Sequence, residues 1–285
     1  MDKSNKIAFL FLLIDNPNFP QIWDYYFKDH HDKINIYIHP KYPHLHTWKP
    51  KCIIKNLQPT GWGFIVDAYM ELFREAFKNP LNTHFVTISE SCLPIKPFDS
   101  FYSLIIKHKP NISLIKIMKI SRYDWDVRLS NQIKYQFKNH LIKHYARMCL
   151  TKSHVSKLLS NKNKVKIFGL MHVGDEFFLS SITPLVKSSY IDFAITHDDW
   201  EYIDRIKKQI KKEIGLLYDK QELTNQDQTI HIEKLRKNYD NIAKNPKKII
   251  KVSKEDLDNM KKTKSFFYRK FDVDSDILKY IYDFI

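Results

Sequence analysis

Glycine is scarce in this sequence, and its scarcity excludes two common kinds of nucleotide site. Only five glycines occur among 285 residues, and no set of them forms GxGxxG or GxxxxGK. These two patterns mark the Rossmann dinucleotide site and the P-loop, whose backbone amides hold phosphates. If this chain binds a nucleotide, something other than a glycine-rich loop must therefore hold the phosphates.

Cysteines and long apolar runs are also few. The three cysteines, Cys52, Cys92 and Cys149, form neither a disulfide framework nor a metal-ligand spacing, which is typical of a reducing compartment. The most apolar run, residues 7–14, is short, whereas a membrane-spanning helix needs about 20 residues. No signal-peptide cleavage pattern follows it. We therefore expect a cytoplasmic protein without a membrane anchor or an export signal.

Basic residues are in excess. The chain carries 47 Lys and Arg against 32 Asp and Glu, a formal net charge of +15, so its field attracts nucleotides, polyanions and anionic surfaces. Residues 200–218 predict a helix with Lys207, Lys208, Lys211 and Lys212 opposite its apolar side. A solvated face is the usual explanation for these lysines, and peripheral contact with an anionic membrane is the alternative. No segment resembles a nucleic-acid-reading motif, so we do not expect a nucleic-acid partner.

The hydrophobic pattern alternates between strands and helices over the first 120 residues. Continuous apolar runs predict strands that are buried on both faces, and apolar residues spaced by three and four predict helices. The alternation predicts an α/β fold with a doubly wound parallel sheet, whose ligands bind beyond the carboxyl ends of the strands. The predicted strands are residues 6–14, 34–38, 52–54, 84–88 and 112–117, and the predicted helices are residues 64–78, residues 98–107 and one that begins at Pro20.

After residue 120 the pattern is less regular. Residues 139–160 indicate mixed helix and strand, and a helix is predicted over residues 175–181. No linker rich in Pro, Gly or Ser marks a domain boundary, so we predict a single large domain over residues 1–285.

Several short stretches carry characteristic residue combinations. They are IAFLFLL at residues 7–13, TGWGF at 60–64, SESCLPI at 89–95, GDEFF at 174–178, THDDW at 196–200 and FYRKFD at 267–272. In this order they resemble the core-2/I-branching β-1,6-N-acetylglucosaminyltransferase family with its bacterial, viral and plant relatives. The resemblance implies a GT-A-like fold and transfer of a sugar from a UDP-sugar with inversion at the anomeric carbon. It also implies that no divalent metal or other cofactor is needed.

The resemblance further implies roles for individual residues. Glu176 matches the family's catalytic base, which takes the proton of the attacking acceptor hydroxyl. Lys270 matches a lysine that contacts the UDP diphosphate. The position of a second cation falls on Lys247 or its neighbour Lys248, with Arg269 as a substitute.

Four further residues are weaker candidates for the nucleotide or sugar pocket. They are His39, Trp62, Glu90 and Trp200. A loop histidine, buried tryptophans and a turn acid explain these residues about as well. Asp175 is assigned instead to the first turn of a helix, where its charge is favourable to the helix dipole.

Two patterns resemble metal sites, and both fail a closer comparison. Asp272, Asp274 and Asp276 have the Asp-x-Asp spacing of metal-dependent glycosyltransferases, but they follow the phosphate lysine instead of a mid-chain strand. His140 and His144 are four residues apart, but HLIKH lacks the glutamate of HExxH, and surface histidines are the better interpretation. We therefore predict no metal site.

The resemblance divides the predicted domain into two halves, with residues 1–120 binding the nucleotide and residues 121–285 carrying the acceptor and catalytic groups. The expected donor is UDP-GlcNAc, with UDP-xylose or another UDP-hexose as alternatives, and the expected acceptor is a glycan or glycoprotein. A sugar-binding homologue without turnover is one alternative function. Another is a basic protein of the same fold that binds nucleic acid or another polyanion, with steep salt dependence and indifference to Glu176.

Overall fold

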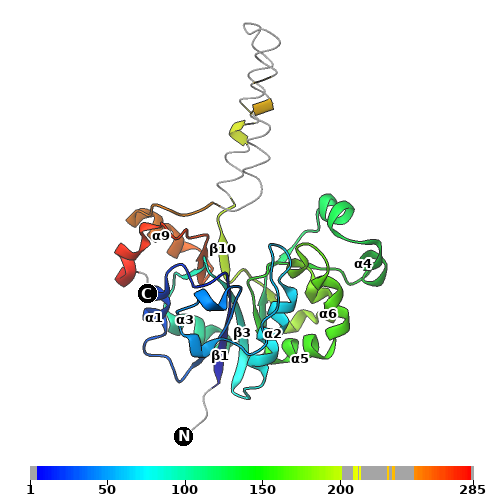
Figure 1. The fold of residues 1–285 in the computed structure, drawn as a ribbon, viewed down its shortest axis with the longest axis horizontal. Helices are drawn as coiled ribbons and strands as arrows, with labels where there is room; N and C mark the ends of the chain where they lie inside the picture. Colours follow the sequence, from blue (N-terminus) through cyan, green and yellow to red (C-terminus); the bar gives the residue numbers. More distant parts are fainter. Residues whose placement is uncertain are drawn as a thin grey trace.

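A six-stranded sheet forms the centre of the molecule (Figure 1). The computed structural model describes residues 5–200, 208–210, 212, 230, 233–234 and 247–283, and the structural statements below concern these residues. The strand order is β2-β1-β3-β8-β5-β9. The bounds are Lys6–Leu13 for β1, Ile34–Pro40 for β2, Asn82–Ser89 for β3, Ser113–Ile115 for β5, Cys149–Thr151 for β8 and Tyr190–Asp192 for β9.

The sheet is mixed, whereas the sequence predicts a parallel one. β1 runs parallel to β2 and to β3, as the predicted β-α-β pattern requires. β8 then pairs antiparallel with β3 on one side and with β5 on the other. All three residues of β8 are buried, and a buried apolar run gives no indication of strand direction. The carboxyl ends of β1, β2 and β3 still share one edge of the sheet.

The side chains of β1 alternate between the two faces of the sheet. Phe9 and Phe11 pack into the core on one face, and Ala8 and Leu10 pack into the core on the other. Successive residues of a strand point to opposite faces, so one continuous apolar strand supports two cores. Full burial of a side chain as large as Phe9 stabilises the fold by roughly 1.5–3 kcal/mol.

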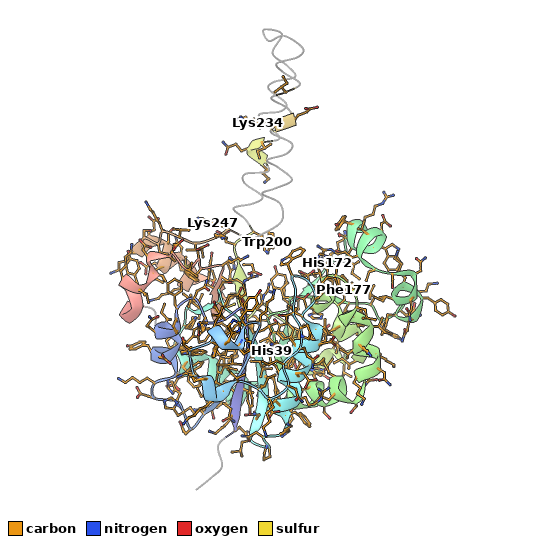
Figure 2. All side chains as sticks on the ribbon, in the orientation of Figure 1. His39, His172, Phe177, Trp200, Lys234 and Lys247 are labelled. Carbon is orange, nitrogen blue, oxygen red and sulfur yellow. The ribbon has the colours of Figure 1, made fainter. Side chains whose placement is uncertain are left out.

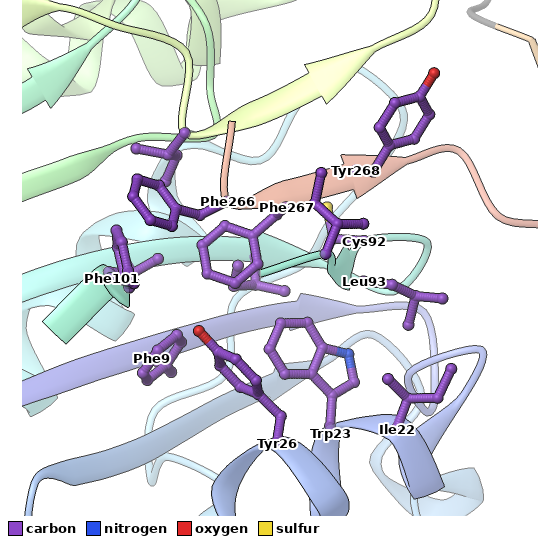
Figure 3. Close-up of a cluster of buried hydrophobic side chains, with 14 of the residues drawn as sticks. Phe9, Ile22, Trp23, Tyr26, Cys92, Leu93, Phe101, Phe266, Phe267 and Tyr268 are labelled. Carbon is purple, nitrogen blue, oxygen red and sulfur yellow. The ribbon is translucent and has the colours of Figure 1, made fainter. Parts of the chain in front are cut away.

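Helices cover both faces of the sheet, as the doubly wound pattern predicts (Figure 1). On the first face, Trp23 and Tyr26 of α1 pack against Phe9, and Phe267 joins the same cluster (Figure 3). Among the described residues, no helix has both the length and the apolar character needed to cross a bilayer. The first face carries α1 (Pro20–Phe27), α3 (Phe98–Tyr102) and α9 (Lys254–Lys262), and the second carries α2 (Val66–Phe77), α5 (Lys152–Ser160) and α6 (Lys162–Gly169).

Two small sheets join distant parts of the chain. β11 (Phe267–Arg269) lies between β10 (Thr196–Asp198), to which it is parallel, and β4 (Leu93–Pro94), to which it is antiparallel. β4 begins shortly after the carboxyl end of β3, so this sheet lies at the edge where ligands of such folds bind. β6 (Ile117–Met118) pairs antiparallel with β7 (Lys143–His144).

Three elements of the first 120 residues differ from those predicted. The strand predicted over residues 112–117 is divided into β5 in the central sheet and β6 in a two-stranded sheet. Residues 52–54 are not a strand, because the 3-10 turn η2 (Pro50–Cys52) precedes Ile53, which forms only an isolated bridge with Ile38. The helix predicted over residues 98–107 is α3, which continues as the π-helical segment η3 (Ser103–His108).

The helix predicted over residues 175–181 is replaced by two 3-10 helices, η5 (Gly174–Glu176) and η6 (Phe178–Ile182). The basic helix predicted over residues 200–218 lies largely outside the described residues, so membrane contact by its lysines stays a prediction. The remaining elements are η1 (Pro43–Leu45), η4 (Asp124–Arg128), α4 (Asn131–Gln136), η7 (Lys187–Ser189) and η8 (Asp276–Asp283).

Candidate active site

Glu176 ends a tight turn that its neighbours enforce. A β-carbon on Gly174 would lie 1.9 Å from the carbonyl oxygen of Phe168, so only glycine fits there. Val173 has a φ of 61°, a left-handed conformation that is rare for a β-branched residue. The turn leaves the side chain of Glu176 27% exposed, while Asp175 beside it is buried. Of the two acids, Glu176 is therefore the one that a substrate can reach.

Two cations face the carboxylate of Glu176. Its Oε2 lies 3.4 Å from Nζ of Lys143 on β7 and 3.5 Å from Nη1 of Arg128 on η4. The two cations restrict the orientation of the carboxylate, because it lies within ion-pair distance of both.

Asp124 holds both cations in place. Its side chain is 1% exposed and accepts hydrogen bonds from Arg128 at 3.0 Å, from Lys143 at 2.9 Å and from the backbone N–H and hydroxyl of Ser121. Burial opposes ionisation, but the hydrogen bonds from Ser121 and Lys143 outweigh it and hold the pKa of Asp124 below its usual value. Asp124 thus stays ionised and fixes the two cations beside Glu176.

Asp175 does not have the capping role that the sequence suggests. η5 has three residues, and its capping residue is Val173, which makes no side-chain cap. Asp175 is 6% exposed, and its Oδ1 has no hydrogen-bond partner in the described part of the chain. Burial raises the pKa of this carboxyl to about 6, Glu176 adds to the rise, and Arg147 opposes it. Asp175 is a buried acid that destabilises the fold when it ionises.

The raised pKa of Asp175 predicts a specific pH dependence of stability. Between the ordinary pKa of 3.8 and the folded value of about 6, the folded state binds more protons than the unfolded state, so stability is lost as the pH rises through this window. In Asp175→Asn this loss is removed. We expect the free energy of unfolding of the variant, minus that of the wild type, to be on the order of 1–3 kcal/mol larger at about pH 8 than at about pH 4, so that the variant gains relative stability as the pH rises.

Denaturant unfolding at both pH values measures this difference. Asp126→Asn is the matched control, because that carboxylate is exposed and pairs with Arg122. The same pH dependence in both variants would contradict the role of Asp175.

A second group of charged side chains lies at the three-stranded sheet of β10, β11 and β4. Asp198 of β10 is buried, and it pairs with Nη2 of Arg147 and with Nη1 of Arg269, each at 3.2 Å. Burial lowers the pKa of Arg147, but Asp198 outweighs this effect and raises the pKa above its usual value. Because two guanidinium groups share one carboxylate, the group keeps an excess of positive charge.

Lys270 follows β11 directly and adds another positive charge. Its side chain is half-buried. Burial lowers the pKa of its ammonium group most, Arg269 lowers it further, and Glu90 at the end of β3 opposes them. Lys270 therefore lies among like charges, and a bound anion would relieve their repulsion.

Tyr145 shows that the two charge groups lie close together. Burial raises the pKa of its phenol, Asp198 and Glu176 raise it further, and Arg147 and Arg269 lower it. Interactions between charges fade over about 10 Å in physiological salt. Glu176, Arg147 and Arg269 therefore all lie within the range of charge interaction with Tyr145.

The other predicted cations are more exposed. Nζ of Lys248 lies 2.9 Å from Oδ2 of Asp272, and 62% of the lysine side chain is exposed. Lys248 also contributes to the lowered pKa of Lys270, so the two lie near each other. Lys247 is exposed, and its backbone N–H donates to the carbonyl of Asp199 at 3.4 Å.

The carboxylates of the Asp-x-Asp pattern have separate partners. Asp272 pairs with Lys248, whereas Asp276 pairs with Lys279 at 2.6 Å and accepts the backbone N–H of Val252 at 2.8 Å. Within the described ranges, no three His, Cys, Asp or Glu side chains gather as a metal ion would require. Independence of metal stays a prediction about the reaction.

A family model described as "Core-2/I-Branching enzyme" matches residues 7–227. The chain belongs to this family. Membership confirms the family that the short stretches predict, and the mixed α/β fold agrees with it. The match includes Glu176 but ends before Lys270, so the assignment of the lysine rests on the FYRKFD stretch and on the geometry above.

One relative of this Core-2/I-Branching chain is Glycosyltransferase BC10 of Oryza sativa subsp. japonica. The two sequences are 27% identical over 111 residues, which cover 35% of this chain and 28% of the relative. The match thus spans less than a third of that protein.

The weaker candidates for the nucleotide or sugar pocket differ in their exposure to solvent. His39 is fully buried, and its Nε2 accepts the backbone N–H of Gln58 at 2.8 Å, so it holds a loop and does not face a pocket. Trp62 is 71% exposed and Trp200 is 37% exposed, so neither is a core tryptophan. Figure 2 shows Trp200 well above His39 and below Lys234. Glu90 lies near Lys270, as noted above.

The surface interpretation of the two histidines is correct for His140 and wrong for His144. His144 lies on strand β7, not on a helix, and it is fully buried, with Nδ1 at 3.0 Å from the carbonyl oxygen of Tyr145. Burial lowers its pKa to about 4. Because side chains alternate along a strand, burial of His144 turns Lys143 toward Asp124 and Glu176.

Sequence reasoning missed four charged residues of the site. Each belongs to an irregular element or a very short strand, where no linear motif marks it. The spacing of Asp124 four residues before Arg128 is the one sequence signal that indicates their ion pair. The four residues are Asp124, Arg128, Lys143 and Arg147.

Proposed function

We propose that this chain is an inverting, metal-independent glycosyltransferase. It would move a sugar, GlcNAc before xylose or another hexose, from a UDP-sugar to a hydroxyl of a glycan or glycoprotein. The observation that carries the proposal is that one partly exposed carboxylate, Glu176, lies within the charge-interaction range of Tyr145 together with Arg147 and Arg269, the two arginines that also act on Lys270. Family membership and the name of the rice relative support it.

Glu176 is the proposed general base. It takes the proton from the acceptor hydroxyl while that oxygen forms a bond to the anomeric carbon of the donor. The bond between the anomeric carbon and the diphosphate oxygen breaks on the opposite face, so a single displacement inverts the configuration. Arg128 and Lys143 lie within 3.5 Å of the carboxylate and hold it in position before the proton arrives.

Lys270 is the proposed partner of the departing UDP. The diphosphate gains negative charge as the bond to the sugar breaks, and preorganised cations stabilise that charge. Arg269 and Arg147 add to the field around Lys270, although both are already paired with Asp198. Lys248 or Lys247 is the proposed second contact with the diphosphate. For Lys248, an ion pair with phosphate would replace its ion pair with Asp272.

Thermal unfolding with UDP, GDP, dTDP and CMP tests the donor class. A ligand that binds only the folded state raises the melting temperature. We expect UDP to stabilise the chain selectively in EDTA, with no further gain from Mg²⁺ or Mn²⁺. Stabilisation by UDP only with metal would overturn metal independence.

A failure of every nucleotide would overturn the proposed donor site. In that case the net charge of +15 makes polyanion binding the function to test. Polyanion binding would be recognised by an affinity for nucleic acid that falls steeply as the salt concentration rises and that is unchanged in Glu176→Gln.

A further inference from the structure

An exposed aromatic group lies beside the segment that carries Glu176. Trp62 is 71% exposed and Phe64 is 46% exposed. The exposed ring of His172 contacts both, with its centroid 4.7 Å from that of Trp62 and 5.6 Å from that of Phe64. We call these three side chains the aromatic platform. The proton transfer and the stabilisation of UDP described above use none of them.

A tight turn fixes the aromatic platform. Gly61 and Phe64 exchange two backbone hydrogen bonds, at 3.2 and 3.0 Å, which leaves Trp62 and Gly63 at the corners of the turn. Gly63 has a φ of 79°, which favours glycine. A β-carbon there would lie 2.6 Å from Cδ2 of His172. The ring of His172 therefore packs against the backbone of Gly63, and the turn fixes the position of the exposed Trp62.

Backbone hydrogen bonds connect the aromatic platform to the base. The N–H of Val173 donates to the carbonyl of Gly63 at 2.7 Å, and the N–H of Glu176 donates to the carbonyl of Val173 at 3.2 Å. In Figure 2, His172 and Phe177, which flank this stretch, lie close to each other in the upper part of the molecule. The platform and the proposed base thus form one hydrogen-bonded unit.

We infer that the aromatic platform binds the acceptor sugar, with Trp62 stacked on the apolar face of a pyranose ring. This inference rests on the proposed function. A pyranose has a face of C–H groups and a rim of hydroxyls, which suits an exposed tryptophan with an apolar ring and a polar edge. A contiguous group of exposed aromatic side chains is a common mark of a ligand or interaction site, whereas single exposed aromatic residues such as Tyr135 are ordinary.

The position of the aromatic platform favours the acceptor over the donor. The charged end of the donor requires cations, and Arg269 and Lys270 supply them, whereas the platform contributes no fixed charge. In a single displacement the acceptor enters on the side of the base, opposite to the departing UDP. A stacking surface on the same hydrogen-bonded unit as Glu176 is where an acceptor ring would rest while its hydroxyl meets the carboxylate.

Steady-state kinetics of Trp62→Ala with a UDP-sugar and a glycan acceptor tests the inference. We expect the KM for the acceptor to rise about tenfold or more, with kcat within about threefold and the KM for the donor unchanged, because uniform binding of the acceptor is what stacking supplies. Trp62→Phe should recover most of the acceptor affinity. Tyr135→Ala, which removes an aromatic side chain that is 89% exposed on α4, is the matched control.

An unchanged KM for the acceptor in Trp62→Ala would overturn the inference. A fall in kcat alone would also overturn it, since the turn would then only position Glu176.

Saturation-transfer NMR separates this inference from the proposed function. The probes are methyl N-acetyl-β-D-glucosaminide and methyl β-D-galactopyranoside, without donor. We expect ring-proton signals of at least one probe with the wild type and Tyr135→Ala, and their loss in Trp62→Ala. If UDP fails to bind while this pattern holds, the donor proposal fails and the platform stands as a saccharide site. If UDP binds and neither probe signal nor acceptor KM depends on Trp62, the platform inference fails alone.

Discussion

Replacing Glu176 with glutamine is expected to lower the turnover number about 10²–10⁴-fold, the usual contribution of a general base. Glutamine keeps the size of the side chain but cannot take the proton of the acceptor hydroxyl. The affinity for UDP should stay nearly intact, because the proposed diphosphate contacts lie at Lys270 and its neighbours. Initial rates with saturating donor and acceptor, together with calorimetric titration of UDP, measure both quantities.

Glu75→Gln is the matched control for this variant. That carboxylate lies on α2 and pairs with Lys78, so the same chemical change there should leave turnover unaffected. Retained turnover in Glu176→Gln would refute the assignment of the base. Loss of UDP affinity would show that the carboxylate acts on donor binding instead.

Replacing Lys270 with alanine is expected to weaken UDP binding by about 1.5–3 kcal/mol, which is the range for a hydrogen bond to a charged group. The dissociation constant would rise about tenfold to 150-fold. The loss should shrink as salt concentration rises, because added ions screen the contact in the wild type. Titrations of UDP at low and moderate salt measure the effect.

Lys264→Ala removes the same charge from an exposed position, two residues after the end of α9 and six residues before Lys270. It therefore controls for the general field of a chain with net charge +15. If both variants lose UDP affinity equally, Lys270 makes no specific contact. Lys270→Arg, which keeps the charge, should retain more affinity than Lys270→Ala.

The first half of the fold could be predicted because its signals are local. The apolar run at β1, the helix that begins at Pro20 and the turn after β3 each depend on residues close in sequence. The direction of β8 could not be predicted, since a three-residue buried strand has the same composition in either direction. The predicted strand at residues 52–54 failed because the turn that begins at Pro50 fixes the backbone just before it.

The candidate site could be predicted in part. The roles of Glu176 and Lys270 follow from short stretches that resemble a family, and both roles stay predictions. Asp124 and Lys143 could not be predicted, because their pairing depends on contact between η4 and β7. The burial of His39 could not be predicted for a related reason: the sequence does not show whether the ring of a histidine near the end of a strand is covered by a loop.

The pairing of β11 with β4 has a consequence for the order in which the protein is made. Asn18 donates a hydrogen bond to the carbonyl of Phe271 across 253 positions of the chain, and β11 inserts between two strands that precede it. Contacts this distant in sequence form slowly, because a long loop must close first. During synthesis the segment of Glu176 leaves the ribosome well before Lys270, so the base can fold in place while the donor-phosphate end is still unmade. A nascent chain at that stage would still lack Lys270, the proposed partner of the diphosphate.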